Sequence, residues 1–212
     1  MMDQVSPPNW ADAAYLRLSD DQRAEQKQRV LDTSPYADEF WVFGFGSLMW
    51  NPGVETVAQQ TATADAFERK FHIWSTVGRG TKENPGLGCC LEHTGGSCRG
   101  LAFSTHMDNL ESDLDYLWGR EMGSGIYIPT WVQVKFDDDE GTKKIALTFV
   151  VDKDHVQYAG PMPVEQMAAY MSGACGKYGK CRDYLANTID AMAKMGDSDP
   201  MLDDLLALID AG

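Results

Sequence analysis

The chain has 212 residues and a mass of 23.5 kDa, which suits one domain or one domain with a terminal arm. Its 18 basic and 32 acidic residues give a net charge of −14, which makes nucleic acid and anionic membrane surfaces poor partners. The sequence shows no membrane-length apolar stretch and no signal peptide, and its cysteine count is the odd number 5. These features predict reduced thiols and a cytoplasmic protein.

Residues 1–38 are predicted to form an N-terminal arm ahead of a main domain at 39–212. Within the arm, Ser19 and Gln22 have the spacing of a capping box, in which two residues reciprocally cap the start of a helix. The helix that follows, to about residue 31, is polar on nearly every face. We therefore expect it to lie on a surface rather than in a core.

The first half of the main domain is predicted to consist mainly of strands, because its apolar runs are short and rich in strand-forming residues. Turn signals at 93–96 and 137–141 predict that the strands flanking each of them pair as a hairpin. The strands are expected, in chain order, at 40–43, 54–64, 66–75, 87–91, 97–103, 130–136 and 143–151.

Helices dominate the second half of the chain. Gly196 suits the C-terminal cap of one helix, and Pro200 suits the first position of the next. Because strands cluster before helices and the connections are short, we expect an α+β fold with a mostly antiparallel sheet that could close into a barrel. The helices are expected at 108–122, 163–172, 179–195 and 200–210.

Glu121 is the strongest candidate for a catalytic residue. It follows Leu110, Leu114 and Leu117 on one face of the predicted helix, so a carboxyl group occupies an inward position. Burial and the negative end of the helix dipole both disfavour its ionisation and should raise its pKa. Such a group can act as a general acid and base, whereas the alternative is a structural salt bridge to Arg120 or Arg99.

A glycine-rich turn at 44–48 follows the first buried strand. Gly44 and Gly46 permit positive φ angles and close backbone approach, so successive amides could point into a cavity and bind a carboxylate or an oxyanion. A plain tight turn is the alternative. The turn is no dinucleotide fingerprint, because Met49 stands where that motif requires a third glycine.

Two further residues could contact a small anionic substrate. Arg79 lies in a glycine-punctuated loop and could bind a carboxylate through two hydrogen bonds, or could simply be a solvated arginine. Tyr158 lies in an irregular segment from which its hydroxyl could reach a pocket, or it could pack in the core.

The cysteines offer weaker possibilities. A zinc site built from Cys89, Cys90, His93 and Cys98 is disfavoured, because adjacent residues of a strand point to opposite faces. A cysteine–histidine nucleophile is equally unsupported, because no cysteine stands at an obvious helix N-terminus near a base.

Together these stretches resemble the ChaC-like γ-glutamylcyclotransferases, in family order over about residues 39–210. The resemblance is specific because it spans most of the chain. The matching segments are WVFGFGSLMWNP at 41–52, WS at 74–75, RGT at 79–81, GSCRG at 96–100, YLWGREM at 116–122, LTFVV at 147–151, QYAG at 157–160 and RDYLANT at 182–188.

The resemblance implies a small mixed β-barrel with flanking helices, and an enzyme that releases 5-oxoproline from a γ-glutamyl peptide. Glutathione is the typical substrate, cysteinylglycine is the second product, and no metal, nucleotide or other cofactor is required. Glu121 matches the catalytic glutamate. The expected substrate-binding residues are Phe43, Gly44, Phe45, Gly46, Ser47, Leu48, Arg79 and Tyr158.

Two positions depart from the family pattern. Phe45 replaces a common tyrosine in the glycine-rich turn, which removes a hydroxyl but leaves the backbone intact. Cys181 stands where an asparagine is common, which could alter substrate positioning. A non-catalytic γ-glutamyl-binding module and a cyclotransferase for other γ-glutamyl amines or amino acids stay open as alternatives.

Overall fold

The computed structural model describes residues 5–10 and 17–212. The chain divides into two compact units. The barrel unit contains the described residues of 17–69 and 91–152, and the helical unit contains those of 5–10, 70–90 and 153–212. Two long strands, β2 and β3, belong partly to each unit.

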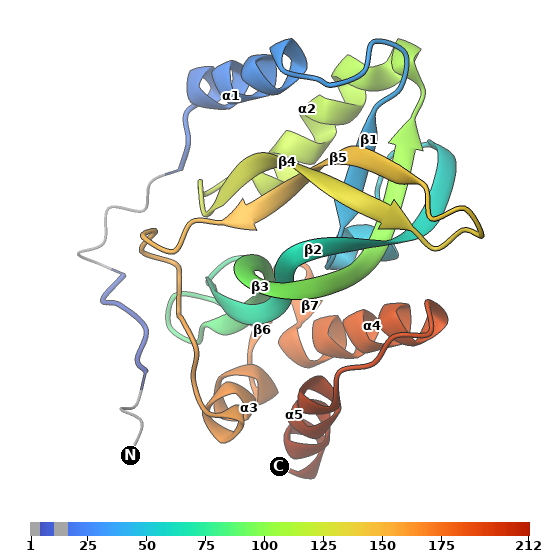
Figure 1. The fold of residues 1–212 in the computed structure, drawn as a ribbon. Coiled ribbons are helices and arrows are strands. Elements are labelled where there is room, and N and C mark those ends of the chain that lie inside the picture. The colour runs from blue at the N-terminus through green and yellow to red at the C-terminus, as the bar shows by residue number, and fades with distance from the viewer. Residues whose placement is uncertain (1–4, 11–16) are drawn as a thin grey trace. The chain divides into compact units, whose positions relative to one another are not determined.

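Five strands close into a barrel in the order β1-β3-β2-β4-β5 (Figure 1). β1 is antiparallel to β3 and parallel to β5, and β4 is antiparallel to both β2 and β5. The predicted α+β fold with a mostly antiparallel, barrel-forming sheet is therefore confirmed. The strands are β1 (Trp41–Gly44), β2 (Thr56–Ser75), β3 (Gly86–Thr105), β4 (Tyr127–Phe136) and β5 (Lys143–Val151).

The hairpin predicted around 137–141 is confirmed. β4 and β5 pair in a continuous antiparallel register from Tyr127 opposite Val151 to Lys135 opposite Lys143. Gly141 in the connection has a φ of 62°, a conformation that glycine adopts without steric cost.

The hairpin predicted around 93–96 is wrong, because residues 86–105 form the single strand β3. Gly95 adopts a φ of 91° inside this strand, so the glycines accommodate a bend instead of reversing the chain. The segments expected to pair with each other find other partners: Leu91 pairs with Val150 of β5, and Leu101 pairs with Gly44 of β1. Likewise the strands expected at 54–64 and 66–75 form one strand, β2, which begins at Thr56 and has Ala66 at a φ of 71° near the expected break.

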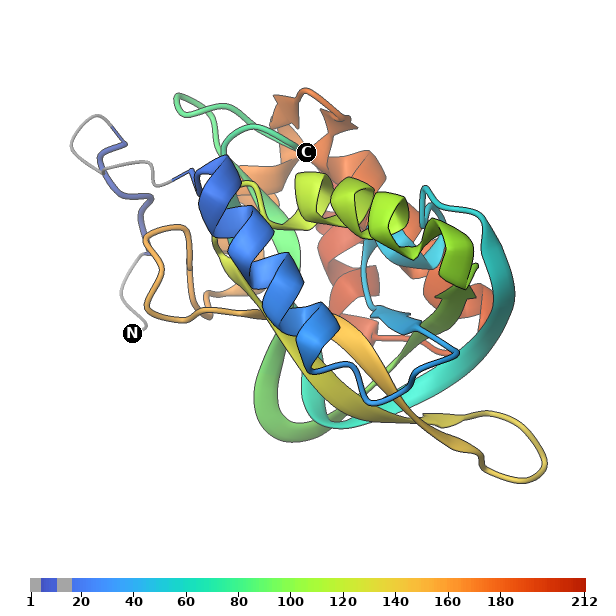
Figure 2. The same ribbon diagram turned by 90° about the horizontal axis from the view of Figure 1, so that it is seen from above.

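The helices agree with the sequence-based expectations. α1 (Asp20–Asp32) begins at the predicted capping box, in which Gln22 N donates to Ser19 Oγ at 3.2 Å and Ser19 N donates to Gln22 Oε1 at 2.8 Å. α2 (Leu110–Glu121) follows a 3₁₀ turn, η2 (Met107–Asn109), and lies in the barrel unit with α1 (Figure 2). No helix in the described residues is long and apolar enough to cross a membrane.

Three helices of the helical unit, α3 (Val164–Ser172), α4 (Cys181–Lys194) and α5 (Pro200–Ala211), pack against one another (Figure 1). A short hairpin of β6 (Cys175–Gly176) and β7 (Gly179–Lys180) precedes α4. Gly196 after α4 has the positive φ of 70° expected at a helix end, and Pro200 opens α5 as predicted.

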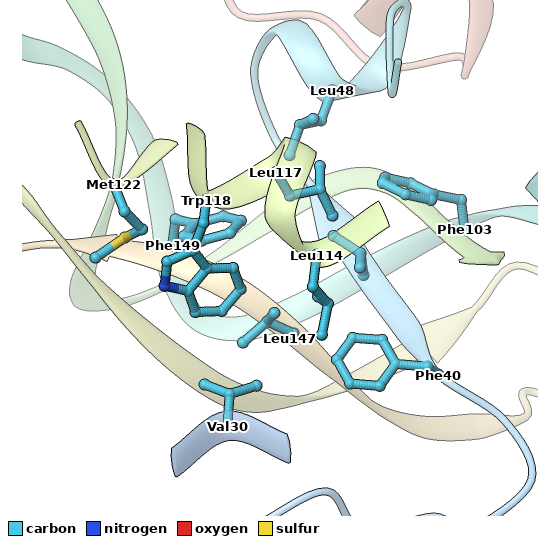
Figure 3. Close-up of a cluster of buried hydrophobic side chains, with 11 residues drawn as sticks. Val30, Phe40, Leu48, Phe103, Leu114, Leu117, Trp118, Met122, Leu147 and Phe149 are labelled. Atoms are coloured by element: carbon cyan, nitrogen blue, oxygen red, sulfur yellow. The ribbon is translucent and has the colours of Figure 1, made fainter. Parts of the chain in front are cut away.

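The core of the barrel unit positions α2. Figure 3 shows Leu114, Leu117 and Trp118 of this helix among side chains of the barrel strands, with Leu147 and Phe149 contributed by β5. Val30 of α1 joins the same cluster although it lies in the predicted arm. Most other residues of α1 stay partly or fully exposed, as the polar pattern of that helix predicts.

Candidate functional site

Glu121 is the last residue of α2 and continues the apolar face of that helix. Leu114 and Leu117 are fully buried, and the side chain of Glu121 keeps 17% of its surface exposed. The predicted inward position of this carboxyl group is thus confirmed. No hydrogen bond reaches the carboxylate from any residue in the described ranges, and its one ion pair is the long contact with Arg120 Nε at 3.6 Å.

The environment of Glu121 raises the pKa of its carboxyl group above the ordinary value of 4.5. Burial is the main cause, and the positive charge of Arg120 opposes it without cancelling it. The end of α2 adds to the effect, because unpaired carbonyls make a helix C-terminus negative. Arg99, the other proposed partner, pairs with Asp137 instead.

The turn at 44–48 joins β1 to η1 (Ser47–Met49), a 3₁₀ turn. Within the described part of the chain, the amides of Gly46, Ser47 and Leu48 have no hydrogen-bond acceptor, whereas Met49 N donates to Gly46 O at 2.9 Å. Three successive donors without an acceptor are what a site for a carboxylate or oxyanion requires. These three amides support the hypothesis, drawn from the sequence, that the turn binds a carboxylate or an oxyanion.

Close packing, not positive φ, explains the need for glycine at position 44. A Cβ atom added there would lie 2.7 Å from Leu48 Cβ and 3.1 Å from the carbonyl carbon of Leu48. Neither Gly44 nor Gly46 is among the residues with positive φ, so that part of the expectation is wrong. Gly46 instead has φ −126° and ψ −130°, a combination outside both the α-helical and the extended regions.

Arg120 links the turn to Glu121 within the barrel unit. Its Nη2 donates to Ser47 Oγ at 3.1 Å, and its Nη1 donates to the carbonyl oxygens of Asn51 and Pro52 at 2.7 and 3.1 Å. Its Nε is the atom nearest Glu121. One side chain therefore joins the catalytic candidate, Glu121, to the binding candidate, the 44–48 turn. Ser47 and Glu121 are 74 positions apart in the sequence.

A second arginine that sequence analysis missed supports the same turn. Arg69 of β2 is 8% exposed, and its Nε donates to the carbonyl oxygen of Phe45 at 2.6 Å. Its Nη2 donates to the carbonyl oxygen of Arg99 on β3 and contacts the sulfur of Met49 at 3.5 Å. No sequence pattern singled it out, because Arg69 stands between Glu68 and Lys70 in a strand with several polar residues.

The remaining predicted residues of the turn are mostly buried. Phe43 is fully buried, and its carbonyl oxygen accepts a 2.9 Å hydrogen bond from Thr148 Oγ1. Phe45 and Leu48 keep 6% and 4% of their surface exposed. These side chains anchor the turn in the protein, and their predicted contacts with substrate stay predictions.

Arg79 and Tyr158 belong to the helical unit. The guanidinium of Arg79 lies 4.8 Å from the ring centroid of Tyr184 and donates to the carbonyl oxygen of Tyr178. Tyr158 is half-buried, bridges to Ile73 in antiparallel fashion and stacks edge-on with His72. Both are held in defined environments, and a substrate-binding role for either stays a prediction.

The cysteines are all free thiols. Cys181 is fully buried and its Sγ lies 3.1 Å from the carbonyl oxygen of Leu87, and burial raises the pKa of this thiol to about 11. No group of three or more potential metal ligands occurs among the described His, Cys, Asp and Glu side chains.

The model of the ChaC-like protein family matches residues 40–211. The chain belongs to this family. A relative from Escherichia coli strain K12, a glutathione-specific gamma-glutamylcyclotransferase, is 36% identical over 92% of this chain and 83% of its own length. Gamma-glutamylcyclotransferase 2-1 of Arabidopsis thaliana is 32% identical over 72% of this chain and 73% of its own.

The fold of this ChaC-like chain is also found in a solved structure. The crystal structure of a glutathione-specific gamma-glutamylcyclotransferase from yeast superimposes with a TM-score of 0.75. The alignment covers 82% of this chain and 97% of the yeast chain at 20% identity. The resemblance noted in the sequence is therefore confirmed at the level of family and fold.

Proposed function

We propose that this chain is a glutathione-specific γ-glutamylcyclotransferase with Glu121 as its general acid and base. One observation supports the assignment of Glu121. Its carboxyl group is mostly buried, has a raised pKa, and is joined through Arg120 to a turn with three available amides. Family membership supports the reaction, and the E. coli relative, which is 36% identical, supports glutathione as the substrate.

The proposed reaction is an intramolecular transfer. The α-amine of the γ-glutamyl group attacks its own γ-carbonyl carbon, so a new C–N bond closes a five-membered ring. The amide bond to the cysteinyl nitrogen then breaks, which gives 5-oxoproline and cysteinylglycine. Because both reacting groups belong to one molecule, a site that folds the γ-glutamyl arm already provides much of the acceleration.

Glu121 would move the proton that this reaction transfers. An α-ammonium group has a pKa of roughly 8 and no lone pair, so a base must take its proton before the nitrogen can attack. The carboxylate of Glu121 would accept that proton and then return it to the departing nitrogen. A pKa raised by burial brings the carboxyl group closer to the range in which it can do both.

The turn at 44–48 would bind the negative charge. Its free amides at Gly46, Ser47 and Leu48 could donate to the substrate α-carboxylate or to the oxyanion that develops on the γ-carbonyl oxygen. Phe45 has no hydroxyl to offer, so the turn would act through its backbone. We assign the turn to binding of a negatively charged oxygen.

We also propose that the protein works in the cytoplasm. The support is its set of five free cysteines, four of them buried, which fits a reducing compartment.

The test is to incubate the purified full chain with glutathione, γ-glutamylalanine and γ-glutamyllysine separately and to measure 5-oxoproline. Turnover of glutathione with release of cysteinylglycine, and little turnover of the other two, is expected. Turnover of either alternative at a higher kcat/KM than glutathione would replace the proposed substrate. Binding of glutathione without any 5-oxoproline would identify a non-catalytic binding module.

A further inference from the structure

Arg120 joins Glu121 to the segment 47–52, which begins inside the 44–48 turn and continues past it. Two of its nitrogens donate to three oxygens of the segment 47–52, and the third nitrogen faces Glu121. Its side chain is 20% exposed, and its hydrogen bonds to Ser47 Oγ and Pro52 O are partly buried. A planar guanidinium can satisfy this set of acceptors at once, whereas a lysine ammonium could not reach them all in that geometry.

One helical turn earlier, Tyr116 supports the other end of the same segment. Gly53 has a φ of 74°, and a Cβ atom placed there would lie only 2.3 Å from Cε1 of Tyr116. The guanidinium of Arg120 also lies 5.7 Å from the ring centroid of Tyr116. The exposed edge of α2 therefore holds 47–53 through two neighbouring side chains.

Arg120 also provides the positive charge next to Glu121. At 3.6 Å it is the one charged group, among the residues that the structure describes, that counteracts the effect of burial on this carboxyl group. The buried side chains that α2 contributes one turn or less before Glu121, Leu117 and Trp118, are apolar and carry no charge. Removing the guanidinium would therefore leave a mostly buried carboxylate without a counter-charge.

We propose that Arg120 is a positioning residue for the reaction, with two separable effects. Its hydrogen bonds hold the segment 47–52 and through Ser47 the end of the 44–48 turn, and its charge favours the ionised form of Glu121, which can accept the substrate proton. The first effect depends on the shape of the guanidinium, and the second depends only on positive charge. This inference rests on the function proposed above.

Two substitutions separate the effects. Arg120→Gln removes both, so we expect the acid limb of the kcat/KM profile against pH to move to higher pH and KM for glutathione to rise about tenfold or more. Arg120→Lys keeps the charge, so we expect the same rise in KM while the acid limb stays close to that of the wild type. Arg99→Gln is the matched control, because it removes a half-buried arginine of the same unit that pairs with Asp137.

The kinetic result can overturn the inference. An Arg120→Gln variant with unchanged KM and an unchanged acid limb would exclude both effects. An Arg120→Lys variant with wild-type KM would exclude the role of the hydrogen bonds. If the glutamine variant fails to fold, the lysine variant tests the hydrogen bonds alone through the same KM measurement.

A titration that needs no turnover separates this inference from the proposed function. The carboxyl carbon of Glu121 can be followed by NMR against pH in the wild type, Arg120→Gln and Arg99→Gln. We expect a higher midpoint only in Arg120→Gln, and a midpoint that does not move would overturn the electrostatic effect. A wild type that gives the expected titration but no 5-oxoproline would refute the proposed function and leave the effect of Arg120 on Glu121 standing.

Discussion

The buried guanidinium of Arg69 donates from Nε to the carbonyl oxygen of Phe45 at 2.6 Å. The carbonyl of Phe45 and the amide of Gly46 belong to one planar trans peptide, so they point in opposite directions. Fixing the carbonyl toward Arg69 therefore directs the Gly46 amide away from it. A strand side chain 24 positions from Phe45 thus sets the direction of the first available donor in the turn.

Gly44→Ala tests whether close packing of this turn is required. The new Cβ would lie 2.7 Å from Leu48 Cβ and 3.3 Å from the amide nitrogen of Met49, so the turn must shift. We expect a lower melting temperature and a kcat/KM for glutathione reduced by at least tenfold. Thermal denaturation and steady-state kinetics provide the two measurements.

Gly119→Ala is the matched control for that substitution. Gly119 lies inside α2 near Glu121, and a Cβ atom there meets nothing within 4 Å. Alanine in a helix is favoured over glycine by about 0.5–1 kcal/mol, so this variant should be as stable as the wild type or more so, with normal activity. Equal losses in both variants would show that the 44–48 turn has no special steric requirement.

Glu121→Gln should nearly abolish turnover. Glutamine has almost the same shape but can neither accept the ammonium proton nor return one to the leaving nitrogen. Because general acid–base catalysis contributes about 10²–10⁴-fold, kcat should fall to roughly 1% or less of the wild-type value. Circular dichroism serves as the control for folding, and a folded variant that keeps most of its kcat would return Glu121 to a structural role.

The same substitution should make stability less dependent on pH. The folded pKa of Glu121 is raised above 4.5, so between that value and the folded pKa the native state holds more protons than the unfolded state. The contribution of this group to stability is therefore greatest at low pH and falls as pH rises through the folded pKa. Glu121→Gln should be more stable than the wild type at pH 7, and the difference should shrink at pH 4, as measured by urea denaturation at both pH values.

The thiols should differ sharply in reactivity. Cys175 is exposed, whereas the other four cysteines are buried and the pKa of Cys181 is raised to about 11. At pH 8 a disulfide reagent should modify about one thiol per native chain and all five after denaturation. Cys175→Ser should remove the native reaction, and rapid modification of that variant would contradict the burial of the remaining thiols.

The sequence alone determined the helix ends, because the interactions that stabilise them form between residues only a few positions apart. The capping box of Ser19 and Gln22, the cap at Gly196 and the proline at 200 each act within a few residues, so the helix ends could be predicted. The inward position of Glu121 was also predictable, because helical periodicity alone places it beneath Leu117.

Only the tertiary structure determined which strands pair with each other and which oxygens accept hydrogen bonds from the arginines. The turn signal at 93–96 predicted a hairpin, but pairing of β3 with β1 and β5 kept the strand continuous. Arg69 and Arg120 reach acceptors 24 and 73 positions away, which no local pattern encodes. Hydrogen bonds over such separations form only after the barrel closes and brings those oxygens within reach. The sequence could therefore identify the turn and the carboxyl group, whereas the side chains that join and orient them emerged from the fold.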